Sequence, residues 1–410
     1  RLSFWSWRRR KLFAVRQYLQ ALNLPFVRVC REELRAILAQ YPDAKGVAVF
    51  PPSAPWYADL YQRPHQIALA LARLGYVVLY WIEDINGDYA TPFREVTDRL
   101  YLCNVPGVVL RAVKRPIVIA PTRTYKWARL LRSPVIVYEP DDHLDTVSNM
   151  PARVLKRYHR RLLKRARVVV GTSDALLAEV KPYRPDAILC PNGVDPAHFA
   201  AVNRSGADDI PLDMRPIMEQ GKPIFGYSGA MAEWLDFDLV EHAAETLPDY
   251  QFVLIGPDFD GLTMQRAGID AYPNIHWLGP KQYAELPRYL ACFDVATLPF
   301  KVSEASNAMS PITLFEYMAG GRPIVTADLA ECRKYPVVLT AGSHEQWVAR
   351  LQEALRLLHD DAHLAELRRT AEENTWTARA WTEIQALDAS TKQSARRSFL
   401  HVFGRMKASI

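Results

Sequence analysis

Short apolar runs alternate with amphipathic stretches from about residue 46 onward. The runs are rich in β-branched and aromatic residues and predict strands, while stretches such as HQIALALARLG, which ends at Gly75, predict helices. Because the runs are apolar throughout rather than alternating, they are typical of parallel strands covered on both faces. The strands predicted in this first series are 46–50, 76–82, 116–120, 135–139, 167–171 and 187–193.

A stretch at 201–221 interrupts this rhythm with Gly, Pro and acidic residues, which is typical of a linker. A second strand–helix series follows it. Two successive series predict an α/β fold of two Rossmann-like domains facing across a cleft, with ligands bound at the carboxyl ends of the strands. The second series has predicted strands at 223–229, 252–256, 275–279, 294–300 and 322–326, and predicted helices at about 311–320 and 344–358.

These patterns also predict the domain boundaries. Residues 46–204 form the first Rossmann-like domain and residues 205–377 the second, and a C-terminal helix at 378–410 is expected to return to the first. Residues 1–45 fit neither series and are interpreted as an N-terminal extension. Within it, QYLQAL and EELRAILAQY predict helices, and LPFVRV between them is interpreted as a strand.

The composition is that of an ordinary globular protein, with 49% hydrophobic and 23% charged residues. No stretch reaches the roughly 18–20 apolar residues of a membrane-spanning helix. The five cysteines are scattered and form no CxxC or Cys/His cluster, so neither a zinc site nor a disulfide framework is expected. Unpaired thiols indicate a reducing compartment and predict a cytoplasmic protein.

The net charge is +6, and the bases gather in acid-free segments at 1–16, 151–167 and after Asp388. This pattern predicts an anionic partner surface, and the expected location is peripheral on the inner face of the cell membrane. A face of the predicted helix 153–167 is the candidate acceptor or membrane contact, although a solvated basic face explains the same spacing. The residues chosen for this face are Arg157, Arg160, Arg161 and Lys164.

The segment AMSPITLFEYMAGGRPIVT (308–326) carries the strongest local signal. Pro311 suits the first turn of a helix, whose free N–H groups and positive end can hold a diphosphate. Glu316 lies about a turn and a half along, where its carboxylate can accept two hydrogen bonds from a ribose diol. A capped helix with a surface glutamate is the alternative interpretation of this segment.

This segment resembles the donor-site element "SPLKLFEYMAAGKPVV" of GT-B glycosyltransferases, especially the family 4-like enzymes of teichuronic-acid and exopolysaccharide synthesis. PNGVDPAHF (191–199), VVVGTSDALL (168–177) and YLACFDVATLPF (289–300) match further elements of the same superfamily in the same order. The resemblance runs from about residue 46 to 387. It implies the GT-B arrangement, with an acceptor domain first and a nucleotide-sugar donor domain second.

The resemblance also implies roles for individual residues. Glu316 would bind the donor ribose, and Ser310, Pro311 and Ile312 would offer the helix start to the phosphates. Gly229 would be a close-approach glycine near the diphosphate, and Gly256 would end the next strand. His276 to Gly279 would border the nucleotide base.

Three positions depart from the wider family. Ala308 stands where the family-4 pattern has its first Glu, and Thr313 stands where the family usually has Lys. Ala230, Met231 and Ala232 follow Gly229 in place of the bases that commonly hold phosphate. Arg63, in a segment resembling the teichuronic-acid subgroup, is therefore a candidate phosphate contact, with a helix-start arginine in a solvated loop as the alternative.

A sugar transfer that inverts needs a base beside the acceptor hydroxyl. VIVYEPDDHLDTVSNMP (135–151) ends a predicted strand with an acidic cluster and resembles the subgroup's "vYDc.Dd" element. Asp142 is the preferred candidate and Asp141 the second, with Glu139 and His143 left open. A metal site at Asp141–His143 is conceivable, but GT-B enzymes usually work without a metal, so none is expected.

Together these features predict a metal-independent glycosyltransferase of cell-surface polysaccharide synthesis. It would move a sugar from a nucleotide-diphosphate sugar, a co-substrate rather than a cofactor, to a hydroxyl of a glycan or lipid-linked acceptor. A catalytically silent GT-B scaffold and a nucleotide-sugar epimerase remain as alternatives. A nucleic-acid partner is not expected, because no RNA- or DNA-binding module accompanies the bases.

Overall fold

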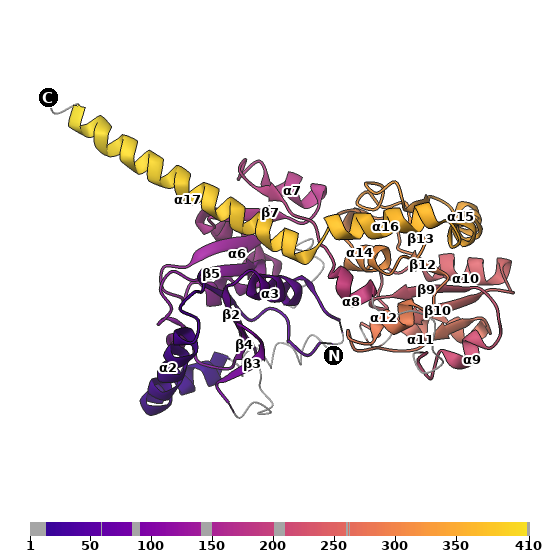
Figure 1. Ribbon diagram of the computed structural model, residues 1–410, viewed down its shortest axis with the longest axis horizontal. Helices are drawn as coiled ribbons and strands as arrows, with labels where there is room; N and C mark the ends of the chain where they lie inside the picture. The colour runs from indigo at the N-terminus through magenta and orange to yellow at the C-terminus, as the bar shows by residue number, and fades with distance from the viewer. Residues whose placement is uncertain are drawn as a thin grey trace. The chain divides into compact units, whose positions relative to one another are not determined.

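The chain folds into two compact units in the computed structural model (Figure 1). The backbone is described for residues 14–58, 60–83, 91–140, 150–200, 210–259, 261 and 263–407, and side chains are described up to residue 392. The first unit comprises Arg1–Trp56, Pro64–Pro191 and Thr377–Ile410. The second unit comprises Tyr57–Arg63 and Asn192–Trp376.

An eight-stranded sheet forms the centre of the first unit, in the order β3-β4-β2-β1-β5-β6-β7-β8. All its neighbouring strands are parallel except the antiparallel pair β3–β4. The predicted apolar runs are confirmed as strands, and β1, β2 and β5–β7 are almost wholly buried. The strands are β1 Val47–Phe50, β2 Val77–Trp81, β3 Phe93–Thr97, β4 Leu100–Cys103, β5 Ile117–Pro121, β6 Val135–Glu139, β7 Val168–Gly171 and β8 Ile188–Leu189.

Helices follow most of these strands, as the alternating pattern predicts. They are α3 Arg63–Arg73, whose first residue belongs to the second unit, α4 Gly107–Leu110, η1 Thr122–Thr124, α5 Tyr125–Ala128, α6 Ala152–Arg165 and α7 Asp174–Val180. The core of this unit includes Leu79, Trp81, Val118 and Tyr138, all with essentially no exposed surface. The apolar strands are therefore covered as expected.

The N-terminal residues form two helices, one at residues 14–22 and α2 at Leu24–Ala39. The prediction of a strand at LPFVRV was wrong, because this stretch is the first half of α2. Asn23 caps it by accepting a hydrogen bond from the Phe26 N–H at 3.1 Å. The apolar face that α2 buries has a helical period and joins the core of the first unit; it consists of Val27, Cys30, Leu34 and Ile37.

The hairpin β3–β4 was missed by the sequence pattern. Strand β3 lies at the sheet edge, and only Phe93 in it is buried. The chain turns between the strands at Arg99, which has a φ of 65° without being glycine. A turn that uses neither glycine nor proline leaves only a weak local signal in the sequence, here Asp98.

The second unit has a six-stranded, wholly parallel sheet in the order β11-β10-β9-β12-β13-β14. Its strands are β9 Ile224–Ser228, β10 Gln251–Ile255, β11 Ile275–Trp277, β12 Val295–Leu298, β13 Ile324–Ala327 and β14 Leu339–Ala341. Of these described strands, only β14 was not predicted. The helices with the sheet are α8 Pro196–Ala200, α9 Arg215–Met218, α10 Phe237–Thr246, α11 Thr263–Ala267, η3 Ile269–Ala271, α12 Leu286–Leu290, α13 Glu304–Asn307, α14 Ile312–Ala319, α15 His344–Leu357 and α16 Asp361–Glu373.

The last helix, α17 (Trp376–Lys407), begins in the second unit and continues in the first. Its residues Ala380, Ile384 and Leu387 are buried. Cys190, after β8, directs its thiol at the Arg379 carbonyl. Among the helices that the structure describes, none combines the length and apolar character needed to cross a membrane.

Candidate functional site

Helix α14 carries the main donor-site candidate of the second unit, Glu316. The helix is almost wholly apolar around this residue, and Leu314, Phe315, Tyr317 and Met318 are buried beside it. Glu316 itself keeps only 7% of its surface exposed. The alternative of a surface glutamate on a capped helix is therefore excluded.

No hydrogen bond or ion pair to the Glu316 carboxylate is found among the described residues. Burial raises the pKa of Glu316 to about 8, because removal from water disfavours the charged form. A buried acid without a protein partner costs folding free energy, and such groups concentrate at functional sites. A hydrogen-bonding ligand would supply the partner that this carboxylate lacks.

The start of α14 is held by the PNG segment that follows the first unit. Asn192 donates from its side-chain amide to the Ser310 carbonyl at 2.6 Å, and its backbone N–H donates to the Ser310 hydroxyl at 3.2 Å. Arg63 is buried and donates to the Asn192 side-chain oxygen at 3.3 Å. Arg63 is thus joined to the helix start through Asn192, which the sequence analysis did not single out although PNGVD contained it.

The helix begins one residue later than expected, with Pro311 as its N-cap and Ile312 as its first residue. No side chain among the described residues caps this first turn. Its N–H groups and the positive end of the helix therefore favour an anion at this place. Ile312 and Thr313 are both half-buried there.

Two predicted glycines pack against each other at the carboxyl ends of neighbouring strands β9 and β10. A Cβ on Gly256, whose φ is +145°, would lie 1.7 Å from the Gly229 carbonyl oxygen. A Cβ on Gly229 would lie 2.3 Å from the Tyr227 hydroxyl. Both positions therefore need glycine, although the Gly229 N–H already donates to the Ile255 carbonyl at 2.8 Å.

A hydrogen bond joins the strand end beside this glycine pair to α14. The Ser228 N–H, at the end of β9, donates to the Tyr317 hydroxyl at 2.8 Å. Gly229 follows Ser228 in the chain, and Glu316 precedes Tyr317. The structure thus brings Gly229, Gly256 and Glu316 to one edge of the second sheet.

His276 lies away from the glycine pair, whereas Trp277 lies beside it. The His276 ring is 2.7 Å from the Gln251 side-chain oxygen, beside the start of β10 and away from the glycine pair. Trp277 donates from its ring N–H to the Gly256 carbonyl at 2.9 Å and is 41% exposed. Its flat face is therefore an accessible aromatic surface next to the glycines.

In the first unit, the preferred base candidates Asp142 and Asp141, as well as His143, lie outside the described residues. Glu139, the remaining acid, ends β6 and is buried. Before it, the Tyr138 hydroxyl lies 2.9 Å from the Thr122 hydroxyl and 2.5 Å from Nδ1 of His159 on α6. This network fixes the end of β6 and one side of α6.

The opposite side of α6 is the predicted basic face, consisting of Arg157, Arg160, Arg161 and Lys164. All four side chains are exposed, and none forms an ion pair with a described carboxylate. Leu155, Leu162 and Leu163 on the other side are buried. The sequence pattern is confirmed: this helix presents charge to its surroundings and apolar residues to the core.

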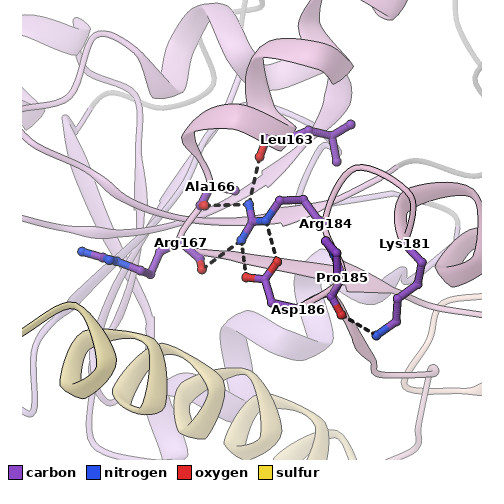
Figure 2. A network of polar contacts seen from close by, with 7 residues as sticks. All are labelled: Leu163, Ala166, Arg167, Lys181, Arg184, Pro185 and Asp186. Atoms are coloured by element: carbon purple, nitrogen blue, oxygen red, sulfur yellow. Dashed lines mark hydrogen bonds and ion pairs between the residues drawn. The ribbon is translucent and has the colours of Figure 1, made fainter. Parts of the chain in front are cut away.

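Arg184 fixes the C-terminal end of α6 (Figure 2). Its guanidinium donates to the carbonyls of Leu163 and Ala166 at 2.8 and 2.9 Å, and to Asp186 at 2.7 Å. The carbonyls at a helix end otherwise lack partners, and a cation there also suits the helix dipole. The hydrogen bond from Arg184 lowers the pKa of Asp186.

Residues 222–360, which contain α14 and the glycine pair, match the family model described as "Glycosyl transferases group 1". The match lies within the second unit. The first unit lies outside the match and has a Rossmann-like sheet of its own. Together these observations define the GT-B fold, with the glycosyltransferase match confined to residues 222–360.

Among curated proteins, the chain is 28% identical over 239 residues to a Bacillus subtilis (strain 168) protein described as a putative teichuronic acid biosynthesis glycosyltransferase, TuaH. The aligned region is 56% of this chain and 59% of TuaH. The chain therefore matches about three fifths of the length of that relative.

Solved structures share the fold at low sequence identity. An α,α-trehalose-phosphate synthase (UDP-forming) from Burkholderia vietnamiensis has a TM-score of 0.65 and 14% identity, covering 86% of this chain and 98% of its own. Anabaena Alr3699/HepE in complex with UDP-glucose has a TM-score of 0.61 and 12% identity, covering 84% of this chain and 99% of its own. At these identities the likeness shows the GT-B fold alone.

Proposed function

We propose that this chain transfers a sugar from a nucleotide-diphosphate sugar to a hydroxyl of a glycan or lipid-linked acceptor in cell-surface polysaccharide synthesis. The observation that carries the proposal is Glu316, a buried carboxylate with no described protein partner, on the family-matched helix α14. A ribose diol supplies the two donors that such a carboxylate lacks. The similarity to a protein described as a putative teichuronic acid biosynthesis glycosyltransferase supports the polysaccharide role.

In the proposed donor complex, the diphosphate lies against the uncapped start of α14. The N–H groups after Pro311 face it, and the glycine pair Gly229 and Gly256 lets the backbone approach closely. Thr313 adds a hydroxyl where the wider family has Lys. Arg63 acts through Asn192 and Ser310, which hold the helix start in position.

For the transfer step, we propose Asp142, and next Asp141, as the base that takes the proton of the acceptor hydroxyl. The hydroxyl oxygen then bonds to the anomeric carbon, and the bond from that carbon to the nucleotide diphosphate breaks. The diphosphate leaves with the electron pair, so the donor supplies the leaving group and the reaction needs no redox partner. The proposal includes neither a resident cofactor nor a metal.

The acceptor side of the proposal includes the basic face of α6. Four exposed bases without described acidic partners suit a lipid-diphosphate acceptor or an anionic membrane surface, at about 1 kcal/mol for each base near such a surface. The proposed location is therefore the inner face of the cell membrane. The scaffold and epimerase alternatives gain no support from the site or the comparisons.

The transfer step is tested by assaying Asp142→Asn for release of nucleoside diphosphate and for labelled product. We expect the variant to keep donor binding and to lose transfer by about a hundredfold or more, because general-base catalysis contributes roughly 10²–10⁴-fold. Asp145→Asn, in the same acidic segment, is the matched control and should stay active. Full activity of Asp142→Asn would contradict the assignment of the base.

A further inference from the structure

The helix at residues 14–22 turns its apolar side away from the protein. Four large apolar side chains recur along it at the spacing of one helix face, and each is more than half exposed. They are Val15 at 55%, Tyr18 at 65%, Leu19 at 60% and Leu22 at 61%. Leu24, directly after the helix, is 73% exposed and extends the same surface.

The side of this helix that faces the first unit is polar. Gln17 is 7% exposed, and its side chain donates to the Val105 carbonyl at 3.0 Å and accepts from the Gly107 N–H at 2.9 Å. A surface helix ordinarily buries its apolar stripe and exposes its polar one. This helix does the reverse, and Gln17 holds it in that orientation.

Exposed apolar stripes of this kind mark an interaction surface. The charges around the stripe indicate which partner it meets. Among the described residues before Glu32 none is acidic, whereas Arg16, Arg28 and Arg31 are basic. The turn that follows α4, the helix on which Gln17 is anchored, adds three exposed bases, which are Arg111, Lys114 and Arg115.

The sequence between Arg99 and Tyr138, which includes this turn, contains no acid. On α2, the acid Glu32 is paired with Arg28 at 3.1 Å, and its neighbour Glu33 is half-buried. An apolar stripe bordered by bases matches a surface that is apolar at depth and negatively charged at its boundary. An anionic lipid bilayer has both properties.

We propose that the stripe Val15, Tyr18, Leu19 and Leu22 inserts into the interface of an anionic bilayer, with the helix lying in the membrane plane. This inference rests on the membrane part of the proposed function and names the element that enters the lipid. The basic face of α6 and the bases near the stripe contact headgroups, whereas the stripe contacts acyl chains. Gln17 connects the inserted helix to the rest of the first unit through its hydrogen bonds with Val105 and Gly107.

The test is sedimentation of the full chain with vesicles of phosphatidylcholine and phosphatidylglycerol. We expect Leu19→Ser/Leu22→Ser to lower the partition coefficient by about tenfold or more, since each buried CH₂ contributes roughly 0.8 kcal/mol to such binding. The melting temperature should stay unchanged, because both side chains are exposed. Leu212→Ser/Val302→Ser, at 76% and 56% exposure in the second unit, is the matched control and should bind like the unmodified chain.

A fluorescent label gives a second readout. All five native cysteines are buried, so Leu19→Cys provides a single accessible thiol for an environment-sensitive dye. We expect its emission to shift to the blue with anionic vesicles and to be quenched by lipid-borne quenchers, whereas a dye at Leu212→Cys should not respond. No shift at position 19, or unchanged vesicle binding by Leu19→Ser/Leu22→Ser, would overturn the inference.

Light scattering without lipid distinguishes the bilayer from a second copy of the chain. A dimer that Leu19→Ser/Leu22→Ser dissociates would identify the stripe as a self-association surface and overturn the lipid assignment. Donor-induced stabilisation and transfer to a water-soluble acceptor should be the same with and without these substitutions. If the unmodified chain shows neither donor-induced stabilisation nor transfer, the proposed function is contradicted. The vesicle result is unaffected by that outcome.

Discussion

At the scale of residues, the central feature is the environment of Glu316. The sequence pattern placed this residue in a recognisable segment, and the resemblance implied its role. Neither revealed that the carboxylate is buried among Leu314, Phe315 and Tyr317 without a described partner, because burial depends on how α14 packs in the second unit. The same packing joins Arg63 to Ser310 through Asn192, a contact between residues far apart in sequence.

The raised pKa of Glu316 predicts how stability depends on pH. The unfolded chain releases this proton near pH 4.5, whereas the folded, ligand-free protein holds it until about pH 8. Stability is therefore fully present below the unfolded pKa and is lost as the pH rises toward the folded pKa, by roughly 1 kcal/mol per pH unit. We expect Glu316→Gln to remove this loss and to be more stable than the unmodified protein at about pH 8.

The measurement is denaturant unfolding of both proteins between about pH 5 and pH 8. Glu331→Gln is the control, since Glu331 is also buried in the second unit but is paired with Lys334 at 2.8 Å. That substitution breaks an ion pair and should destabilise the protein at pH 8. A constant difference between Glu316→Gln and the unmodified protein across this range would contradict the raised pKa.

At the scale of elements, α6 combines a fixed position with an exposed basic face. Arg184 holds its C-terminal end and His159 contacts Tyr138, so the four bases are presented on an anchored helix. We expect replacement of all four bases of the basic face by Gln to weaken vesicle binding on the order of a thousandfold at low salt, because each base contributes about 1 kcal/mol. Raising the salt concentration should shrink the difference between the variant and the unmodified chain.

A control variant with the same change in net charge distinguishes the effect of the basic face on vesicle binding from the effect of total charge. It replaces four exposed bases of the second unit by Gln, which are Arg266, Arg333, Arg356 and Arg368. We expect this control to bind vesicles almost as well as the unmodified chain. Equal loss in both variants would show that net charge, and not α6, determines the binding.

The hydrophobic pattern predicted most of the described strands and the longer helices, because buried parallel strands and the helices that cover them have a strong pattern in the sequence. The pattern failed where that signal is weak. Strand β3 is exposed and reaches β4 through Arg99 instead of a glycine turn, and α2 begins with LPFVRV, whose β-branched residues suggested a strand. In α2 the capping by Asn23 and the packing against the first unit outweigh this local preference.

At the scale of the whole molecule, each unit has its own sheet and its own core. The family-matched segment, the glycine pair and Glu316 all belong to the second unit, whereas the acidic segment at 141–145 and the basic face belong to the first. We expect the second unit to bind the donor and the first unit to bind the acceptor. Helix α17 rejoins the first unit, where Cys190 contacts the Arg379 carbonyl.

The central claim is that Glu316 binds the ribose of a nucleotide-sugar donor, and the most direct measurement is donor-induced thermal stabilisation of the full chain. UDP-, GDP- and dTDP-sugars are each tested against the unmodified protein, Glu316→Ala and the control Glu331→Gln. We predict that at least one donor raises the melting temperature of the unmodified protein and of the control, and that Glu316→Ala abolishes the rise. An equal rise in Glu316→Ala, or no response of the unmodified protein to any of the donors, would contradict it.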